Sequence, residues 1–380
     1  MNYAIAALFL PLFVHILNVW NWSLGMRGAF QKAPLRTPDT ETALPPLGVV
    51  LPVRNEAETL PKLMGDLAKQ THLPLQVIVI DDRSDDGTLQ ALEDAGPFPF
   101  QVTTMSNPGQ GKKAGLSAGI LQLTCDWAIG VDADTRLKPE ALAAMGRGIE
   151  NQAEEKDMFL LPLRIALDAS SAPDNLFHLL QGLDFAAMQG WAVSSVQRGQ
   201  PAMASGGGWV WRAKAFPHNR LHPEIPSGDD VFALAALIQD EKGHRVGWIN
   251  DPMAMVSAAP MLNFGALLDQ RIRWGAKSTQ YPRSLKSARR VALAVAAVHL
   301  CGLVLMFIHL GFGIAFWLIK SIADVLYTRQ MAKQYGLFEK RTPANGVALL
   351  MLALAHPFFI ATTLLLMPFR KVRWKGRPAT

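Results

Sequence analysis

The sequence predicts an α/β domain of Rossmann-like type, built on a mostly parallel sheet and flanked on both sides by hydrophobic helices. From residue 47 onward, short apolar runs alternate with segments of helical periodicity. This order is typical of a parallel sheet with helices on both faces. Before and after that region lie long apolar runs with very few charges, long enough to cross a bilayer.

Composition agrees with an association with membranes. The chain has 380 residues, of which 50% are hydrophobic and only 18% are charged, and its formal net charge is +6. Much of the Lys and Arg lies beside the apolar ends, a pattern that favours an anionic membrane surface over nucleic acid as the partner. The cysteines, Cys125 and Cys301, lie far apart and indicate neither a disulfide framework nor a metal knuckle.

The first apolar run, Tyr3–Trp22, carries no charge. Three basic residues follow it instead of preceding it: Arg27, Lys32 and Arg36. A signal peptide has the opposite order, so we interpret residues 1–24 as an uncleaved transmembrane anchor with the following domain in the cytoplasm. A buried hydrophobic helix is the alternative. Residues 25–46, rich in Pro and Thr towards their end, are interpreted as a tether.

The catalytic domain is predicted over residues 47–290. Strands are predicted at 47–53, 76–81, 100–105, 127–131 and 158–163. Helices are predicted between them at 59–69, 88–94, 113–121 and 139–149.

Residues 291–369 form a second apolar region. Val291–Ile319 is long enough for one membrane span, or for two when it is taken together with Ala323–Tyr327. Val347–Met367 is long enough for a further span. The sequence therefore predicts either two or three membrane segments in this region. Lys320 and Asp324 are four residues apart and are predicted to pair. The tail, residues 370–380, is basic and indicates a cytoplasmic C-terminus. His309 and His356 are interpreted as packing or interface residues.

Two carboxylates leave the strand at 127–131. Asp132 and Asp134 lie on either side of Ala133, and a bend at Ala133 would let Asp134 face a divalent cation while Asp132 meets a ribose or a second oxygen. Mg²⁺ and Mn²⁺ take oxygen ligands and keep waters and substrate phosphates. Ligands of open α/β sheets bind beyond the carboxyl ends of the strands, where these acids lie. A turn that merely closes the strand has the same pattern.

Other polar clusters follow the first two predicted strands and open the helix at 113. Pro52 is expected to end the first strand, which places Arg54–Glu56 at the sheet edge, within reach of a base and ribose. Asp81 and Asp82 follow the second strand and can accept hydrogen bonds from uracil or ribose. Lys112 and Lys113 lie at a helix start, which attracts anions, although a solvated charge pair has the same pattern.

Two further motifs precede the C-terminal apolar region. Asp229-Asp230 starts a helix, where acids serve as caps or, beside a metal site, as a general base. In Gln270-Arg-Ile-Arg273-Trp274, Arg273 supplies a fixed cation for phosphate oxygens and Trp274 a flat apolar wall. A basic juxtamembrane helix is the alternative for this motif.

Together these motifs resemble the family-2 glycosyltransferases of GT-A fold. The resemblance is to the membrane-anchored branch that includes cellulose synthase, hyaluronan synthase and ceramide glucosyltransferase. It covers roughly residues 47–274 and follows that branch's series D, DxD, (E/D)D and QxxRW in order.

The resemblance implies roles for individual residues. The nucleotide would be held by Pro52, Arg54, Asn55, Glu56, Asp81 or Asp82, and Lys113. Mg²⁺ or Mn²⁺ would be held by Asp134 with help from Asp132. Asp230 would be the base, while Gln270, Arg273 and Trp274 would close over the diphosphate and acceptor. Gly206–Trp209 matches the loop that borders the acceptor site. Because the motif here is Gly-Asp-Asp, Asp229 stays open as the base.

The function implied by the resemblance is inverting transfer of a sugar from a nucleotide-sugar, with UDP as the expected nucleotide. The expected acceptor is lipid or polyprenyl-linked, at the cytoplasmic face of the inner (plasma) membrane, in a multi-pass protein. A small processive polysaccharide synthase is the alternative, disfavoured because a secretion channel needs a larger bundle of helices. A nonenzymatic nucleotide-sugar sensor is a third reading, disfavoured because all the expected acids are present.

Overall fold

The computed structural model describes residues 2–31, 43–152, 154–167, 175–225, 227–338, 343–375 and 377–378. The chain forms two compact units, each assembled from separate stretches. The sheet unit comprises Gln31–Ala166, Met203–Ser284 and Met367–Thr380, and the helical unit comprises Met1–Phe30, Leu167–Ala202 and Leu285–Leu366. The limits of 47–290 for a catalytic domain remain a prediction; within them, one helix, α7 (Leu176–Gln197), belongs to the helical unit.

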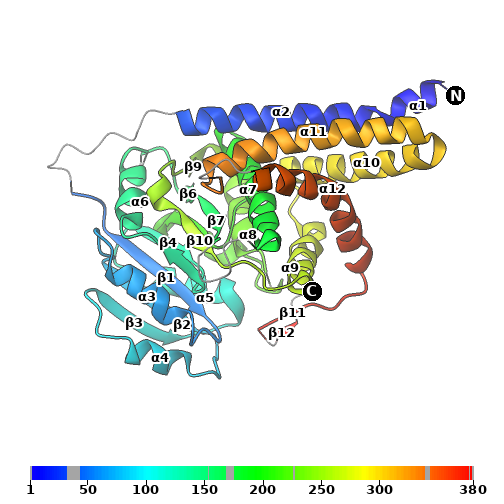
Figure 1. The fold of residues 1–380 in the computed structure, drawn as a ribbon. Helices are drawn as coiled ribbons and strands as arrows, with labels where there is room; N and C mark the ends of the chain where they lie inside the picture. Colours follow the sequence, from blue (N-terminus) through cyan, green and yellow to red (C-terminus); the bar gives the residue numbers. More distant parts are fainter. Residues whose placement is uncertain are drawn as a thin grey trace. The chain divides into compact units, whose positions relative to one another are not determined.

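The sheet unit contains a seven-stranded sheet in the order β3-β2-β1-β4-β8-β6-β9 (Figure 1). Its strands are β1 (Leu47–Val53), β2 (Gln76–Asp81), β3 (Gln101–Ser106), β4 (Trp127–Val131), β6 (Met158–Leu160), β8 (Gly208–Arg212) and β9 (Val246–Trp248). The first four are mutually parallel, β8 runs antiparallel to both neighbours, and β9 is parallel to β6. The predicted mostly parallel sheet is therefore confirmed.

A second sheet has the order β5-β10-β7. Its strands are β5 (Thr135–Leu137), β7 (Leu163–Ile165) and β10 (Val256–Ala258). The prediction of one strand over 158–163 was wrong, because the chain leaves the large sheet after Leu160 and enters the small one at Leu163. Pro162, which has no N–H to donate, lies between them.

Pro52 does not end the first strand, as β1 continues to Val53. The strand tolerates it because β1 pairs with β4 only as far as Val50, so Pro52 is paired on one side alone, with Ile80 of β2.

The helices of the sheet unit are α3 (Leu60–Ala68), α4 (Thr88–Asp94), α5 (Gly111–Ile120), α6 (Ala141–Glu150), α8 (Asp229–Gln239) and α9 (Phe264–Ala276). Helix α5 packs closely on β1 and β2. A Cβ at Gly119 would lie 2.5 Å from both Ile80 Cδ1 and Val50 Cγ1, so the close approach requires glycine. This packing fixes the first turn of α5 near the carboxyl ends of the strands.

The helical unit consists of α1 (Asn2–Leu8), α2 (Leu10–Gln31), α7, α10 (Lys286–Ile308), α11 (Leu310–Gln334) and α12 (Pro343–Leu366). Within the described residues, four helices are long and apolar enough to cross a membrane: Ile5–Arg27, Lys286–Ile308, Leu310–Gln334 and Pro343–Leu366. Three of these helices follow residue 285, a region for which the sequence predicted either two or three membrane segments.

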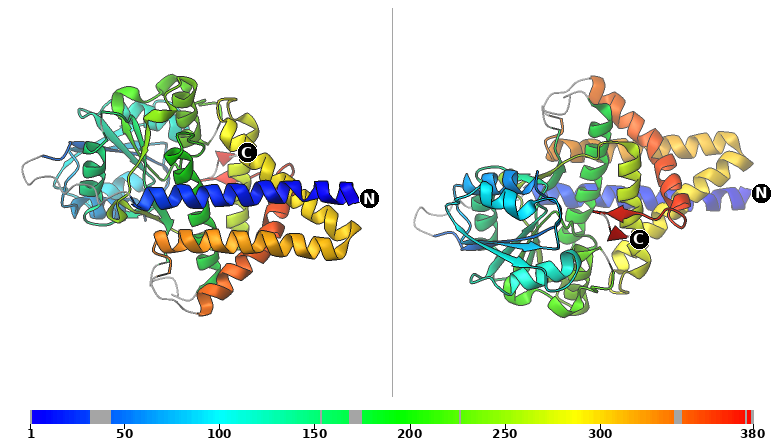
Figure 2. Two further views of the ribbon diagram at one scale, coloured as in Figure 1. Left: turned by 90° about the horizontal axis from the view of Figure 1, so that it is seen from above. Right: turned by 90° about the horizontal axis from the view of Figure 1, so that it is seen from below.

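Helices α2, α10 and α11 lie side by side (Figure 2) around a small apolar core. The core is made by Leu12, Val298, Leu305 and Phe316. The outer faces of these helices expose large apolar side chains, among them Phe13, Trp20, Leu293, Phe307 and Leu318. An extensive exposed apolar surface is unusual in water and is typical of a membrane-embedded bundle.

The predicted pairing of Lys320 with Asp324 is confirmed. Lys320 Nζ lies 2.6 Å from Asp324 Oδ2, and its residue is only 1% exposed. The sequence did not indicate the third member, His15, whose Nε2 lies 2.7 Å from Asp324 Oδ1. A buried lysine is thereby compensated inside the helical unit.

Candidate active site

The candidate site begins where β4 ends and β8 starts. Val131 and Gly208 are register partners, so Asp132 follows β4 directly beside the glycine loop that precedes β8. Lys112, in the first turn of α5, places Nζ 2.6 Å from Asp132 Oδ1 and donates to the Gly206 carbonyl at 2.8 Å. The same ammonium lies 3.4 Å from Asp229 Oδ2. One lysine therefore joins three segments that are distant in sequence.

The electrostatics of Lys112 follow from this position. Burial lowers the pKa of its ammonium, but the Asp132 and Asp229 carboxylates outweigh burial, so the pKa lies above its ordinary value. Lys112 is thus a permanently charged cation among acids.

The glycine loop touches the same acids. A Cβ at Gly206 would lie 3.2 Å from both Asp229 Oδ2 and Lys112 Nζ. A Cβ at Gly207 would lie 3.3 Å from Asp132 Oδ2. These tight contacts explain why small residues stand beside the carboxylates.

Lys113, the predicted nucleotide ligand, is directed elsewhere. Its Nζ donates to the His222 carbonyl at 2.8 Å and lies 4.2 Å from the centre of the Phe232 ring. The residue is 4% exposed, and burial lowers the pKa of its ammonium to about 8. Lys112, rather than the predicted Lys113, is the lysine that reaches the acids.

Asp134 stands close to other carboxylates. Its side chain is exposed, yet desolvation by the surrounding protein, followed by the charges of Asp132 and Glu56, raises its pKa to about 6. Lys375 opposes that rise. The charges of Asp132 and Glu56 repel an ionised Asp134, which makes this a place where a cation is electrostatically favoured.

Asp230 opens α8 and accepts a hydrogen bond at 2.8 Å from the Val231 N–H. Burial raises the pKa of its carboxyl; Lys277 opposes this, and Asp229 reinforces it. Lys277, which follows the last residue of α9, is 9% exposed and was not among the residues predicted from the sequence.

Arg273 of α9 lies within the field of the acid cluster. Burial lowers the pKa of its guanidinium, and the carboxylates that oppose this are Asp132, Asp229, Asp230 and Asp134. Neighbouring Arg271 donates to Gln270 Oε1 at 3.2 Å and stacks 4.5 Å from the centre of the Trp274 ring. Arg273 therefore lies within electrostatic range of both predicted acid pairs.

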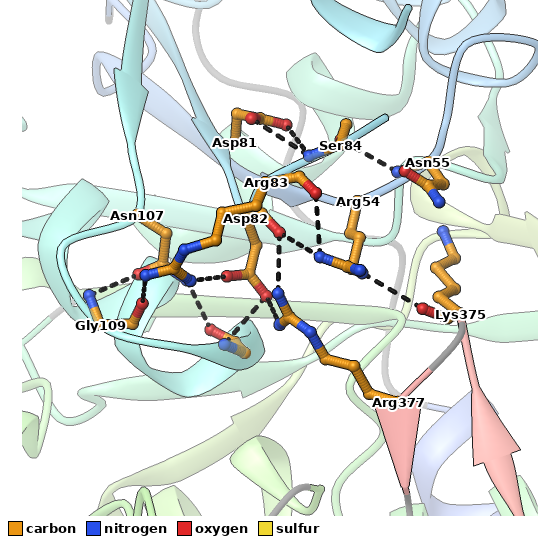
Figure 3. Close-up of polar contacts among 11 residues, drawn as sticks. Arg54, Asn55, Asp81, Asp82, Arg83, Ser84, Asn107, Gly109, Lys375 and Arg377 are labelled. Carbon is orange, nitrogen blue, oxygen red and sulfur yellow. Dashed lines mark hydrogen bonds and ion pairs between the residues drawn. The ribbon is translucent and has the colours of Figure 1, made fainter. Parts of the chain in front are cut away.

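The second group of predicted residues lies on the loops after β1 and β2 (Figure 3). Asp81 is used locally, because both its oxygens accept from the Ser84 N–H, at 3.2 and 3.3 Å. Asp82 is 5% exposed and faces the start of α5, accepting from the Gly111 N–H at 3.0 Å and from Arg83 Nη1 at 3.1 Å.

Arg54 and Asn55 connect these loops. Arg54 Nη1 donates to the carbonyls of Asp82, at 2.7 Å, and Arg83, at 2.9 Å. The Asn55 N–H donates to Ser84 Oγ at 3.0 Å. Both predicted nucleotide ligands thus also fix the shape of the loops.

The C-terminal tail reaches the same loops, which the sequence did not indicate. Lys375 forms an ion pair with Glu56. Arg377 forms an ion pair with Asp82, which Figure 3 shows. Arg54 Nε donates to the Lys375 carbonyl at 3.2 Å.

The donor set fits a hard divalent cation held partly by substrate. Within the described ranges, no three His, Cys, Asp or Glu side chains are grouped closely enough to form a metal cage. Mg²⁺ sites in phosphate-transfer enzymes commonly use one or two carboxylates and complete the shell with phosphate oxygens and water. Asp132 and Asp134, with the repulsion that raises the pKa of Asp134, meet that requirement.

The fold has a solved counterpart. The structure is similar to the mannosyltransferase PcManGT from Pyrobaculum calidifontis, solved with GDP-Man and Mn²⁺, with a TM-score of 0.56 and 15% identity. The match covers 96% of this chain and 99% of that chain. It confirms the GT-A fold.

Curated relatives match part of the chain. An undecaprenyl-phosphate 4-deoxy-4-formamido-L-arabinose transferase of Pseudomonas fluorescens is 35% identical over 101 residues, which are 25% of this chain and 30% of the relative. A 4,4'-diaponeurosporenoate glycosyltransferase of Staphylococcus haemolyticus is 29% identical over 137 residues, 35% of this chain and 36% of the relative. The chain thus spans about a third of the length of each.

Family models cover most of the chain. The model described as glycosyl transferase family 2 matches residues 48–155. The model described as glycosyl transferase family group 2 matches residues 127–367, more than half of the chain, and these include the acid cluster, α9 and the helices that follow it. The chain therefore belongs to glycosyl transferase family group 2 and is a glycosyltransferase.

Proposed function

We propose that this protein transfers a sugar, with inversion, from a nucleotide-sugar to a lipid or polyprenyl-linked acceptor at a membrane surface. The observation that carries the proposal is the pairing of Lys112 with Asp132, which follows β4, and with Asp229, which opens α8. Arg273 lies within electrostatic range of the same acids. The relatives named above act on undecaprenyl phosphate and diaponeurosporenoate by their names, and both are isoprenoid compounds. The helices able to span a bilayer support an acceptor of that class.

The donor is proposed to be a UDP-sugar. Asp82 offers carboxylate oxygens at the carboxyl end of β2, and Glu56 does so after β1, where a base and ribose bind in open α/β sheets. Lys113 is not part of this proposal, because its ammonium is bound to the His222 carbonyl.

Mg²⁺ or Mn²⁺ is proposed to bind at Asp134, with Asp132 as its second protein ligand. When bound, the cation would supply charge stabilisation for the departing diphosphate. Arg273 acts beside it as a fixed cation, which burial keeps poorly hydrated and therefore effective. Lys112 holds Asp132 and Asp229 in place, and Gln270 and Trp274 flank Arg273 on α9.

Asp230 is proposed as the general base that removes the proton of the acceptor oxygen. Burial raises the pKa of this carboxyl, which makes the ionised form a stronger base than an exposed aspartate. With one base and direct displacement, the anomeric centre inverts, so an α-linked donor gives a β-glycoside.

The decisive test is incubation of the purified protein in detergent with nucleotide-sugars, Mn²⁺ and extracted lipids, followed by mass spectrometry of the lipid fraction. We expect one added sugar per lipid from a UDP-sugar. A ladder of sugars would instead identify a processive synthase, and binding without any transfer would identify a sensor.

The orientation is proposed to place the sheet unit in the cytoplasm, with the protein multi-pass in the inner (plasma) membrane. A cysteine introduced at Glu140, which is exposed, reports on this in a chain whose Cys125 and Cys301 are replaced by Ala. Impermeant maleimide should label it in broken cells and leave it unlabelled in intact ones; labelling in intact cells would reverse the orientation.

A further inference from the structure

The C-terminal hairpin is formed by β11 (Arg373–Trp374) and β12 (Arg377–Pro378), which pair antiparallel. It begins seven residues after Leu366, the last residue of α12. The hairpin contacts the loops after β1 and β2, more than 290 residues away in sequence (Figure 3).

Arg377 binds both the carboxylate and the carbonyl of Asp82. Its Nη1 pairs with Asp82 Oδ2, and its Nη2 donates to the Asp82 carbonyl at 3.2 Å. Oδ2 already accepts from the Gly111 N–H at 3.0 Å, and Oδ1 accepts from Arg83 at 3.1 Å. A carboxylate offers about four lone-pair sites, so little accepting capacity is left for a nucleotide.

Lys375 binds the second acid, Glu56. Its ammonium pairs with Glu56, and its carbonyl accepts from Arg54 Nε at 3.2 Å. The Glu56 side chain is 12% exposed and that of Asp82 is 7% exposed, so both pairs are partly shielded from water. Shielded pairs are weakened less by salt than surface bridges are.

The hairpin thus presents one cation to each of the two acids proposed to bind the nucleotide, Lys375 to Glu56 and Arg377 to Asp82.

We propose that the C-terminal hairpin is a tethered competitor of the donor, which must leave Asp82 and Glu56 before a nucleoside diphosphate and its divalent cation bind. The inference rests on the proposed function of the same site. It differs from a lid that closes over bound donor, because a lid would add affinity and a competitor removes it.

The test uses full-length protein in detergent and titrates UDP in the presence of Mn²⁺, with no acceptor. The variant Lys375→Ala/Arg377→Ala should bind UDP about tenfold more tightly than the unaltered chain, the factor expected if the hairpin is docked about nine-tenths of the time. Lys371→Ala removes one tail cation that is exposed to solvent and should leave the affinity unchanged.

Hydrogen exchange of the 373–378 peptide provides the second measurement. UDP with Mn²⁺ should increase its exchange in the unaltered chain, because the hairpin is displaced. Unchanged or weaker UDP binding by the double variant, or increased protection of the peptide, overturns the inference while leaving the proposed function intact. If neither UDP nor GDP binds to any form with Mn²⁺, the donor site itself is wrong, and the inference fails with it.

Discussion

Lys112 and Asp132 form an ion pair, with 2.6 Å between Nζ and Oδ1, that joins the first turn of α5 to the end of β4. Because the same ammonium lies 3.4 Å from Asp229, this lysine neutralises part of the repulsion between two acid-bearing segments. The pair therefore holds the geometry on which the proposed transfer depends.

We predict that Lys112→Met lowers sugar transfer by at least about tenfold, or ~1.4 kcal/mol in activation free energy. Without the ammonium, Asp132 and Asp229 lose their common partner and the Gly206 carbonyl loses its donor. Initial rates at saturating donor measure the effect.

Lys113→Met is the matched control on the neighbouring position. It removes the bond to the His222 carbonyl and the contact with Phe232, so it should lower the melting temperature while folded protein keeps most of its transfer activity. A greater loss of transfer in folded Lys113→Met than in Lys112→Met would contradict this assignment.

The sequence does not determine which of the two adjacent lysines, Lys112 or Lys113, enters the site. Consecutive residues on an α-helix point about 100° apart, so the choice between Lys112 and Lys113 depends on where α5 begins and how it is rotated against the sheet. The rotation is set by Gly119 packing onto Ile80 and Val50, a tertiary contact. The motif marks a cationic helix start without fixing which side chain enters the site.

The parallel strands and the acids at their ends could be predicted, because apolar runs bounded by turns and acids are local features. The contact of Arg377 with Asp82 could not, since the residues lie 295 apart in sequence. In the sequence, the basic residues of the tail are equally consistent with binding to a membrane surface.

The metal proposal gives a direct prediction. Asp134→Ala should abolish transfer and the Mn²⁺-dependent part of UDP binding, while the melting temperature stays near that of the unaltered chain because the side chain is exposed. Asp94→Ala, at the end of α4, is the control and should keep both sugar transfer and Mn²⁺-dependent UDP binding. Full activity of Asp134→Ala in EDTA would exclude Asp134 as the cation's ligand.

The buried pair in the helical unit gives a prediction about stability. Asp324→Ala leaves Lys320, which is 1% exposed, without its carboxylate, and removing one partner of a buried pair typically costs about 3–5 kcal/mol. The double variant Lys320→Met/Asp324→Leu should recover most of the loss, because no unpaired charge is buried. Thermal unfolding in detergent tests both; a stable Asp324→Ala would mean that the pair contributes little.

The last prediction separates Asp230 from Asp229. A group that acts only on the acceptor proton should affect turnover and leave donor binding alone. Asp230→Asn keeps the shape of the side chain and removes the basic oxygen, so we expect turnover to fall at least about a hundredfold with UDP affinity nearly unchanged. Asp229→Asn should cost clearly less turnover, since Asp229 is held by Lys112 and supports the site.

Stability provides an independent reading of the same pair. Burial raises the pKa of the Asp230 carboxyl in the folded chain above its value in the unfolded chain. The folded chain therefore binds the carboxyl proton more tightly. The contribution of this carboxyl to stability falls as the pH rises from the unfolded pKa to the folded pKa. Asp230→Asn removes the buried charge and should melt no lower than the unaltered chain at pH 7, even though its turnover is lost. If instead Asp229→Asn shows the larger loss of turnover, the base is Asp229. If Asp230→Asn loses UDP binding, this carboxylate belongs to the donor site, and the acceptor proton must go to another group.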